Sequence, residues 1–229
     1  MKFESNCKAI DPIRKLPLLF QSDFDGTLTE EDISFLILDE FAEGDWRAVL
    51  HEYQAGKISV GAFNSRTFAM VKKDRDFLTR FIKEKAKLRP GLNELLEYCR
   101  TSGIRFAIVS NGLDFYIRAL MERYRLNGTA IVAARTVFTP NGIDARYYSP
   151  QGQEMTGAFK ESYTRLYIQQ GFDVIYAGNG PSDIPASKLA GHTFATGTLL
   201  DYYTSEGLKC CPFADLNDVL RGLKEISAV

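Results

Sequence analysis

Two aspartates one residue apart, Asp23 and Asp25, have the clearest capacity for chemistry in this chain. They follow a short apolar segment, residues 16–22, which predicts a buried strand that ends in a polar loop. The spacing can aim both carboxylates into the same space. Carboxylates that close repel each other, so we expect a metal ion or a shared proton between them. An Asp-Gly pair is also an ordinary turn, which is the alternative for this segment alone.

Two further positions carry polar groups that suit a phosphate. Ser110, Asn111 and Gly112 follow the apolar segment 105–110 and offer a hydroxyl and turn amides to phosphate oxygens. Lys160 stands near the start of a predicted helix, where the helix dipole disfavours a cation. The alternatives are an ordinary turn for the first group and a solvated surface lysine for the second.

A glycine-rich segment, residues 178–183, follows the apolar run 174–177 and leads into a predicted helix. Its sequence is Gly-Asn-Gly-Pro-Ser-Asp, and Asp183 is a candidate metal ligand or an acid that supports one. Ser182 or Asp183 would serve equally well as a helix cap, which is the structural alternative.

The predicted elements alternate along most of the chain. Strands are expected at 16–22, 105–110, 174–177 and, more weakly, 192–196, and helices at 91–101, 113–124, 158–170 and 182–190. This order predicts an α/β fold with a doubly wound, Rossmann-like parallel sheet covered on both faces. Ligands bind such sheets beyond the carboxyl ends of the strands, so the polar groups above should converge on one crevice.

Two segments depart from the alternation. Residues 29–88 show several amphipathic helical patterns without a strand between them, which predicts an inserted helical cap subdomain. The catalytic core would then comprise residues 1–28 and 89–229. Between residues 132 and 149, a Pro-Asn-Gly turn separates two β-prone segments and predicts a hairpin.

Composition narrows the class of partner. The 229 residues carry a formal net charge of -1, with Lys and Arg interleaved among acids, which argues against nucleic acid as a partner. No apolar run has the length of a signal peptide or a membrane span, so the expected location is the cytoplasm.

Four cysteines at positions 7, 99, 210 and 211 lack metal-ligand spacing, and we expect free thiols.

The four polar groups, in the order DFDGT, SNG, Lys160 and GNGPSD, closely resemble the motifs of the haloacid dehalogenase superfamily, in its phosphatase branch. The resemblance covers nearly the whole chain and looks closest to phosphoserine phosphatases and to the methionine-salvage phosphatase. It implies a Rossmann-like sheet under a mobile helical lid, a small phosphorylated metabolite as substrate and Mg²⁺ as cofactor.

The resemblance also implies roles for the first motif. Asp23 would attack phosphorus to give an aspartyl phosphate, and Asp25 would protonate the leaving alcohol and then activate water. A carboxylate facing a phosphate is repelled by about 4 kcal/mol per pair of unit charges about 4 Å apart at a dielectric near 20. Mg²⁺ and Lys160 would offset this repulsion.

Ligands for phosphate and metal follow in the same way. Thr27 and Ser110, with the amides around Asn111 and Gly112, would hold phosphoryl oxygens. Mg²⁺ would bind Asp23, the backbone carbonyl of Asp25 and the fourth motif. That motif usually begins Gly-Asp in this family, whereas here Asn179 follows the glycine, so the site loses one negative charge and Asp183 is left as its acid.

Other functions and substrate contacts stay open at this point. A phosphomutase or phosphotransferase would share every catalytic residue. A phosphorylated receiver module also combines aspartates, Ser or Thr and Lys on such a sheet, but its phosphorylated Asp ends a later strand. Within the cap, Asp32 and Arg66 are candidates for substrate contacts, with a solvated surface arginine as the alternative for Arg66.

Overall fold

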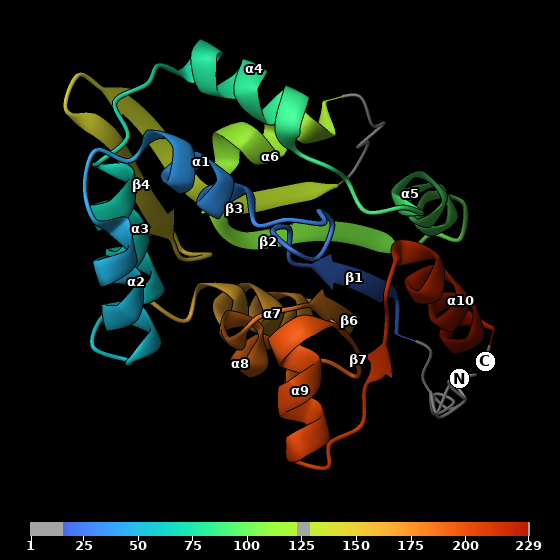
Figure 1. Cartoon of the computed structure of the whole chain (residues 1–229). Coiled ribbons are helices and arrows are strands. Elements are labelled where there is room, and N and C mark those ends of the chain that lie inside the picture. Colours follow the sequence, from blue (N-terminus) through green and yellow to red (C-terminus); the bar gives the residue numbers. More distant parts are fainter. Residues whose placement is uncertain (1–15, 123–128, 229) are drawn as a thin grey trace.

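The computed structural model describes residues 16–122 and 129–228, and within them one sheet runs through the centre of the molecule (Figure 1). Its strands are Leu18–Ser22 (β1), Arg105–Leu113 (β2), Ala130–Thr139 (β3), Gly142–Tyr148 (β4), Glu154–Met155 (β5), Asp173–Gly178 (β6), His192–Ala195 (β7) and Cys211–Pro212 (β8). They lie in the order β5-β4-β3-β2-β1-β6-β7-β8. The six strands from β3 to β8 in this order are parallel, whereas β4 and β5 extend the sheet as an antiparallel hairpin and edge. This confirms the predicted fold class.

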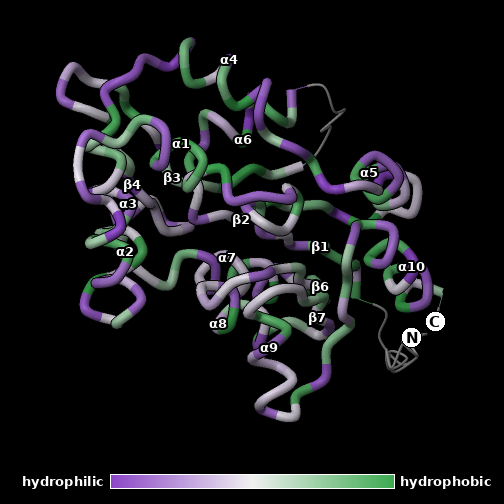
Figure 2. The backbone as a smooth tube through the Cα atoms, in the orientation of Figure 1, coloured by the Kyte–Doolittle hydropathy of each residue, from purple (hydrophilic) through white to green (hydrophobic). Residues whose placement is uncertain are grey.

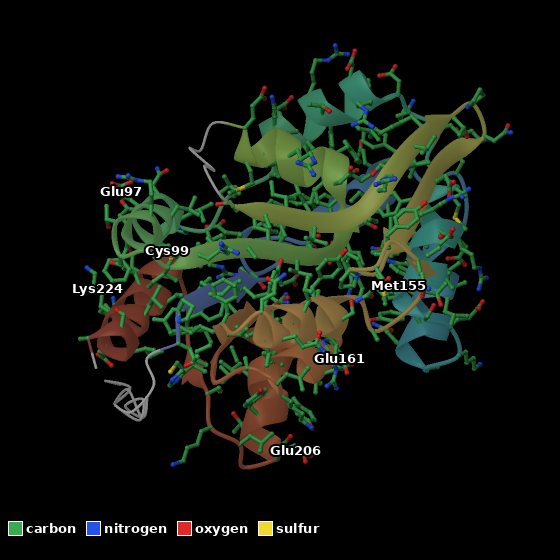
Figure 3. All side chains as sticks on the ribbon, turned by 180° about the vertical axis from the view of Figure 1, so that it is seen from behind. Glu97, Cys99, Met155, Glu161, Glu206 and Lys224 are labelled. Carbon is green, nitrogen blue, oxygen red and sulfur yellow. The ribbon has the colours of Figure 1, made fainter. Side chains whose placement is uncertain are left out.

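Helices cover both faces of the sheet. They are Ile33–Phe41 (α1), Trp46–Gln54 (α2), Val60–Phe68 (α3), Arg75–Lys85 (α4), Leu92–Thr101 (α5), Asp114–Met121 (α6), Phe159–Gln169 (α7), Ile184–Ser187 (α8), Gly197–Ser205 (α9) and Leu216–Ser227 (α10), with a 3₁₀ turn at Pro181–Asp183 (η1). Figure 1 shows α7 and α8 below the sheet and α5 beside α10 on the other side. Cys99 on α5 and Lys224 on α10 mark this helix pair in the reverse view of Figure 3.

The central strands are apolar because both of their faces are covered. Phe20 in β1 is fully buried and stacks on Phe106 in β2 with ring centroids 5.3 Å apart. Figure 2 shows hydrophobic, green stretches in the central strands and alternating green and purple along the helices. Burial of this kind contributes about 25 cal/mol for each Å² of apolar surface removed from water. The sheet is therefore a rigid base for the loops at its edge.

The segment between residues 29 and 88 carries α1 to α4. Its two ends pair with each other through an antiparallel bridge between Thr29 and Leu88. Arg89, the next residue, donates from Nε to the Thr27 carbonyl (3.0 Å) and from Nη2 to the Gly26 carbonyl (2.9 Å). The exit from the inserted helices is thus fastened to the loop that carries the paired aspartates.

The inserted helices also rest on the β3-β4 hairpin. Ser65 in α3 donates to the Ala145 carbonyl of β4 at 3.0 Å, and the backbone N–H of Gly61 donates to the Thr156 carbonyl at 3.1 Å. Gly142 opens β4 at φ +123°, and a Cβ there would lie 2.1 Å from the Ala69 carbonyl oxygen at the end of α3. The hairpin predicted from the Pro-Asn-Gly turn is present, and its glycine lets the two segments meet.

Several elements depart from the sequence predictions. The two-residue strands β5 and β8 were not predicted, since they leave no periodicity to detect. The sequence predictions also omitted the helices α9 and α10. The expectation of four free thiols is wrong for Cys211, which is disulfide-bonded, whereas Cys99 and Cys210 are free. Cys211 lies half-buried in the edge strand β8, and the spacing of the cysteines in the sequence does not reveal its disulfide. Cys7 and residues 123–124 of the predicted helix lie outside the described residues.

The hydropathy of the helices bears on whether the chain could cross a membrane. In the described part of the chain, no helix combines the length and the apolar character needed to cross a membrane.

We predict that Gly142→Ala destabilises the fold more than Gly152→Ala. Both glycines have positive φ, which costs a residue with a Cβ about 1–2 kcal/mol. Only Gly142 also faces backbone atoms at short distance, whereas nothing lies within 4 Å of a Cβ at Gly152. We expect an additional loss of about 1–3 kcal/mol for Gly142→Ala. Urea unfolding of both variants measures the difference, and equal losses would contradict close packing of α3 on the hairpin.

Candidate active site

The paired aspartates, the Ser110 segment and the glycine-rich segment meet at one edge of the sheet. Strand β1 lies between β2 and β6, so the loops that follow these three strands are neighbours. The backbone N–H of Asp23 donates to the Ala177 carbonyl at 2.9 Å, which extends the pairing of β1 and β6 by one residue. Ser110, Asn111 and Gly112, predicted as a turn after the strand, instead lie within β2, at a register irregularity between Val109 and Leu113. The expected convergence of polar groups at this edge of the sheet is present.

Lys160 forms the centre of this arrangement. Its Nζ lies 2.8 Å from Oδ1 of Asp23 and 2.6 Å from Oδ1 of Asp183. The lysine is 3% exposed, and Asp23 and Asp183 are 5% and 0% exposed. The alternative of a solvated surface lysine is therefore wrong. Burying one ammonium group with two carboxylates gives a triad in which each charge depends on the others.

Asp183 is held on both oxygens. Oδ1 accepts hydrogen bonds from Lys160 and from the Tyr176 hydroxyl, each at 2.6 Å. Oδ2 accepts from the backbone N–H groups of Asn179 (3.0 Å) and Gly180 (2.9 Å). Because these donors use its carboxylate, Asp183 ties the glycine-rich loop to Lys160.

The start of α7 is shaped to bury Lys160. Ala158, which precedes the helix, has φ +54° and is the one non-glycine with positive φ among residues 16–122 and 129–228. A left-handed conformation outside glycine is strained and needs surrounding structure to hold it. In the next turn, Thr164 donates to the Gln21 side chain of β1 at 3.0 Å. Glu161, adjacent to Lys160, lies instead on the outer side of α7 (Figure 3), where it pairs with Arg165 at 2.7 Å.

Asp25 is held by residues from two other segments. Oδ2 accepts from the Tyr116 hydroxyl of α6 at 2.5 Å, and Oδ1 accepts from the backbone N–H of Ile33 in α1 at 3.0 Å. The Tyr116 hydroxyl lies 3.0 Å from Oγ of Ser34, also in α1. Asp25 is 9% exposed, so its carboxyl group is largely shielded from water.

Burial dominates the electrostatics of the two aspartates. Desolvation raises the pKa of Asp23, as does the charge of Asp183, while Lys160 acts in the opposite direction. Desolvation likewise raises the pKa of Asp25 well above its usual value, and the nearby charge of Asp32 adds to the rise. Burial and the charge of Asp25 raise the pKa of Tyr116, so its hydroxyl keeps the proton that it donates.

Desolvation alone would lower the pKa of Lys160, but the charges of Asp183 and Asp23 outweigh it and raise the pKa above its usual value. The lysine therefore stays charged at neutral pH. A carboxyl group that is readily protonated and a fixed cation side by side suit proton transfer next to a dianionic substrate.

The candidate phosphate ligands lie around the same edge. The Ser110 side chain is buried and accepts from the backbone N–H of Gly112 at 2.9 Å, and Thr27 donates to Oδ1 of Asn179 at 3.3 Å. The Asn111 carbonyl accepts from Asn64 of α3 at 2.8 Å and also from the Tyr147 hydroxyl of β4. The segment around Ser110, at the end of β2, is thus fixed by both the inserted helices and the hairpin.

Oxygen donors that suit a hard cation are present, although with one carboxylate fewer than expected. The Asn179 side chain lies against the first loop, since a Cβ on Gly26 would be 2.2 Å from its Nδ2. Its amide oxygen accepts from the Thr27 hydroxyl of the same loop at 3.3 Å. With the Asp23 carboxylate and the Asp25 carbonyl, it would give a set of neutral and charged oxygens of the kind that binds Mg²⁺. Within the described ranges, no group of three or more His, Cys, Asp and Glu side chains is placed to hold a metal.

The two candidate substrate residues differ in their surroundings. Asp32 caps α1 by accepting from the backbone N–H of Phe35 at 3.0 Å, and burial raises its pKa to about 6. Its charge acts on Asp25, which places it at the border of the site. Arg66 forms a two-point ion pair with Glu52 at 2.5 and 3.2 Å, and both side chains are exposed.

Sequence reasoning missed three residues that hold the site together: Tyr116, Tyr176 and Arg89. The sequence pattern predicts both tyrosines as core residues, because one hydroxyl group at an apolar position does not change the periodicity of hydrophobic residues. Arg89 follows the inserted helices directly and binds loop carbonyls, which no spacing rule indicates. Their one sequence signal is proximity to the motifs, since Tyr116 lies six residues after Ser110 and Tyr176 precedes the glycine-rich segment.

We predict that Asp32→Asn stabilises the protein at pH 8 and has little effect near pH 4. The folded-state pKa of Asp32 is raised to about 6 from 3.8, so ionising it opposes folding as pH rises through this window. Below the lower value, both folded and unfolded chains are protonated and the gain disappears. Asn retains helix capping, and we expect a gain of about 1–3 kcal/mol at high pH.

Urea unfolding from pH 4 to pH 8 measures this effect. Asp74 caps α4 in the same way at an exposed position, so Asp74→Asn controls for the loss of a capping charge. A gain that does not vary with pH for Asp32→Asn would contradict the assignment of a half-buried carboxylate whose charge is disfavoured.

Comparisons with known proteins identify relatives in both sequence and fold. The family model for haloacid dehalogenase-like hydrolases matches residues 21–188. A 2-hydroxy-3-keto-5-methylthiopentenyl-1-phosphate phosphatase of Brevibacillus brevis is 29% identical over 91% of this chain and 96% of its own length. The protein of the same name from Bacillus velezensis is 29% identical over 94% and 93%.

Solved structures show the same fold. A phospho-aspartyl intermediate analogue of phosphoserine phosphatase superposes with a TM-score of 0.67, covering 93% of this chain and all of that chain at 21% identity. A probable phosphoserine phosphatase from Vibrio cholerae gives a TM-score of 0.69 at 18% identity, covering 91% of this chain and 64% of that one.

Proposed function

The chain belongs to the haloacid dehalogenase-like hydrolase family and is a phosphatase of that family, a phosphoric monoester hydrolase; on this premise, we propose that it hydrolyses a small-metabolite monoester through Asp23. The observation that carries the proposal is the buried contact of Lys160 with Asp23 at 2.8 Å. A carboxylate held by a fixed cation at the edge of three strands is oriented for attack on phosphorus.

Two steps follow from the residues. In the first, a carboxylate oxygen of Asp23 bonds to phosphorus while the bond from phosphorus to the ester oxygen breaks, and Asp25 gives its proton to the departing oxygen. In the second, Asp25 takes a proton from water, whose oxygen attacks the phosphoryl group on Asp23. Inorganic phosphate leaves and both aspartates are restored. The raised pKa of Asp25 supports the first role, because the carboxyl must start protonated.

Lys160, Thr27 and Ser110 would neutralise and orient the phosphoryl oxygens, as would the amides beside Gly112. Mg²⁺, held by Asp23, the Asp25 carbonyl and Asn179, would supply the further positive charge that lets a carboxylate approach a phosphate dianion. Asn179 fits this role better than Asp183, because the carboxylate of Asp183 is already engaged by Lys160, Tyr176 and two backbone N–H groups.

For the substrate, we propose a class of compound, a small phosphorylated metabolite. The names of the relatives make phosphoserine and 2-hydroxy-3-keto-5-methylthiopentenyl-1-phosphate the first compounds to compare. Arg66 would have to leave Glu52 to meet a substrate carboxylate, which favours a substrate without one. A screen of phosphorylated metabolites with Mg²⁺ ranks them. Release of inorganic phosphate, compared with transfer to an added alcohol, separates a hydrolase from a phosphotransferase.

We predict that Asp23→Asn lowers the rate of phosphate release on the order of 10³-fold or more while the fold is retained, because the amide is a poor nucleophile. Beryllofluoride, which mimics a phosphoryl group on a carboxylate, should inhibit the wild type and fail to bind this variant. Initial rates and fluorine NMR measure the two effects, with the exposed Asp76→Asn as control. Turnover near the wild-type rate in Asp23→Asn would refute the nucleophile.

We predict that Asn179→Asp lowers the Mg²⁺ concentration for half-maximal activity by about tenfold or more. It adds one negative charge to the cation site, and a few kcal/mol of charge interaction changes affinity by that order. Calorimetry and initial rates over a Mg²⁺ titration measure it, with Asn141→Asp at the exposed hairpin turn as control. Unchanged Mg²⁺ affinity would show that this loop does not hold the cation.

A further inference from the structure

We propose that Tyr116 is a positioning residue for the acid-base group Asp25, linking it through Ser34 to the first inserted helix. This inference rests on the proposed function, because it assigns a task within the same two-step reaction. Nothing in the four sequence motifs includes Tyr116.

The contact between Tyr116 and Asp25 is short and enclosed. The phenol hydroxyl donates to Oδ2 of Asp25 at 2.5 Å, and Tyr116 is 0% exposed. The end of β2 makes room for it, since a Cβ on Gly112 would lie 1.9 Å from the Tyr116 hydroxyl and 2.3 Å from Oδ2 of Asp25. The absence of a side chain at Gly112 therefore leaves the space in which the Tyr116 hydroxyl meets the Asp25 carboxyl group.

The second contact of the hydroxyl fixes its direction. Oγ of Ser34 lies 3.0 Å from the Tyr116 hydroxyl, and Ser34 is buried in the first turn of α1. The preceding residue, Ile33, donates its backbone N–H to Oδ1 of Asp25 at 3.0 Å. Asp25 is thus held on one oxygen by the α1 backbone and on the other by a tyrosine that α1 also contacts.

Two anchors determine the plane of a carboxyl group, which one anchor leaves free to rotate. With the plane set, the remaining lone pairs point in fixed directions, toward the leaving oxygen in the first step and the water in the second. Proton transfer is sensitive to such alignment. A phenylalanine at position 116 would fill the same volume but leave Oδ2 without its donor. The carboxyl would then be free to turn.

The two steps depend on Asp25 to different extents for different esters. An alkyl phosphate needs a proton on its leaving oxygen, whereas a nitrophenyl phosphate has a stable leaving group and needs little help. Hydrolysis of the aspartyl phosphate needs Asp25 as base in both cases. A misaligned Asp25 should therefore let the phosphorylated enzyme accumulate when the substrate is p-nitrophenyl phosphate, which a general loss of folded protein would not do.

The experiment compares Tyr116→Phe with Tyr203→Phe in the full chain with Mg²⁺. Tyr203 is also buried, and its hydroxyl donates to Ser187 at 3.0 Å, away from the aspartates. For Tyr116→Phe with p-nitrophenyl phosphate, we expect kcat to fall roughly tenfold to hundredfold and KM to fall with it, because slow hydrolysis of the phosphorylated enzyme lowers both and leaves kcat/KM nearly unchanged. Acid quenching followed by mass spectrometry should find a larger phosphorylated fraction at Asp23. Tyr203→Phe should match the wild type.

Each outcome decides. If Tyr116→Phe keeps the wild-type kcat and phosphorylated fraction, the positioning role is refuted while the proposed function stands. If the wild type neither turns over nor becomes phosphorylated, the proposed function fails and this inference fails with it. Should Tyr116→Phe not fold, Ser34→Ala decides, because it removes only the hydroxyl that Tyr116 contacts. An unchanged phosphorylated fraction in Ser34→Ala then refutes the role, and an increased one supports it.

Discussion

The arrangement of the site depends on one buried cation placed between two acids. Lys160 lies 2.8 Å from Asp23 and 2.6 Å from Asp183, with almost no access to water. Removing one partner from such a group typically costs about 3–5 kcal/mol, because a charge is left buried without compensation. The pairing therefore joins β1, α7 and the glycine-rich loop into one unit, and the strained Ala158 is accepted to deliver the lysine.

The remaining contacts extend from this centre in two directions. Asp183 accepts a hydrogen bond from the backbone N–H of Asn179, and the Asn179 side chain lies against the first loop. On the other side, Asp25 is bound by Tyr116 and by the start of α1, so its geometry depends on where the inserted helices sit. Asn179 itself is neutral, so this segment contributes the Asp183 carboxylate as its acid, and that carboxylate is already bound by Lys160, Tyr176 and two backbone N–H groups.

The sequence predicts the fold class because its signals are local. Apolar runs ending in Asp23, Ser110 and Gly178 predict parallel strands, and parallel strands bring their ends together. Tyr116 and Arg89 could not be predicted in the same way, since their partners are distant in sequence. Tyr176 binds Asp183 seven residues on, but a tyrosine in a buried strand gives the same sequence pattern as any aromatic residue. The disulfide at Cys211 escaped for the same reason, because no spacing pattern distinguishes it from its free neighbour Cys210.

The bridge between Thr29 and Leu88 brings the two ends of the inserted helices to a single point on the core. The 58 residues between them replace what could be one short turn, because the chain leaves and returns at neighbouring positions. The inserted region can therefore change in length or shape over evolutionary time without displacing β1 or α5. Such changes would have to keep the contacts by which Ile33 of α1 and Asn64 and Ser65 of α3 bind the core.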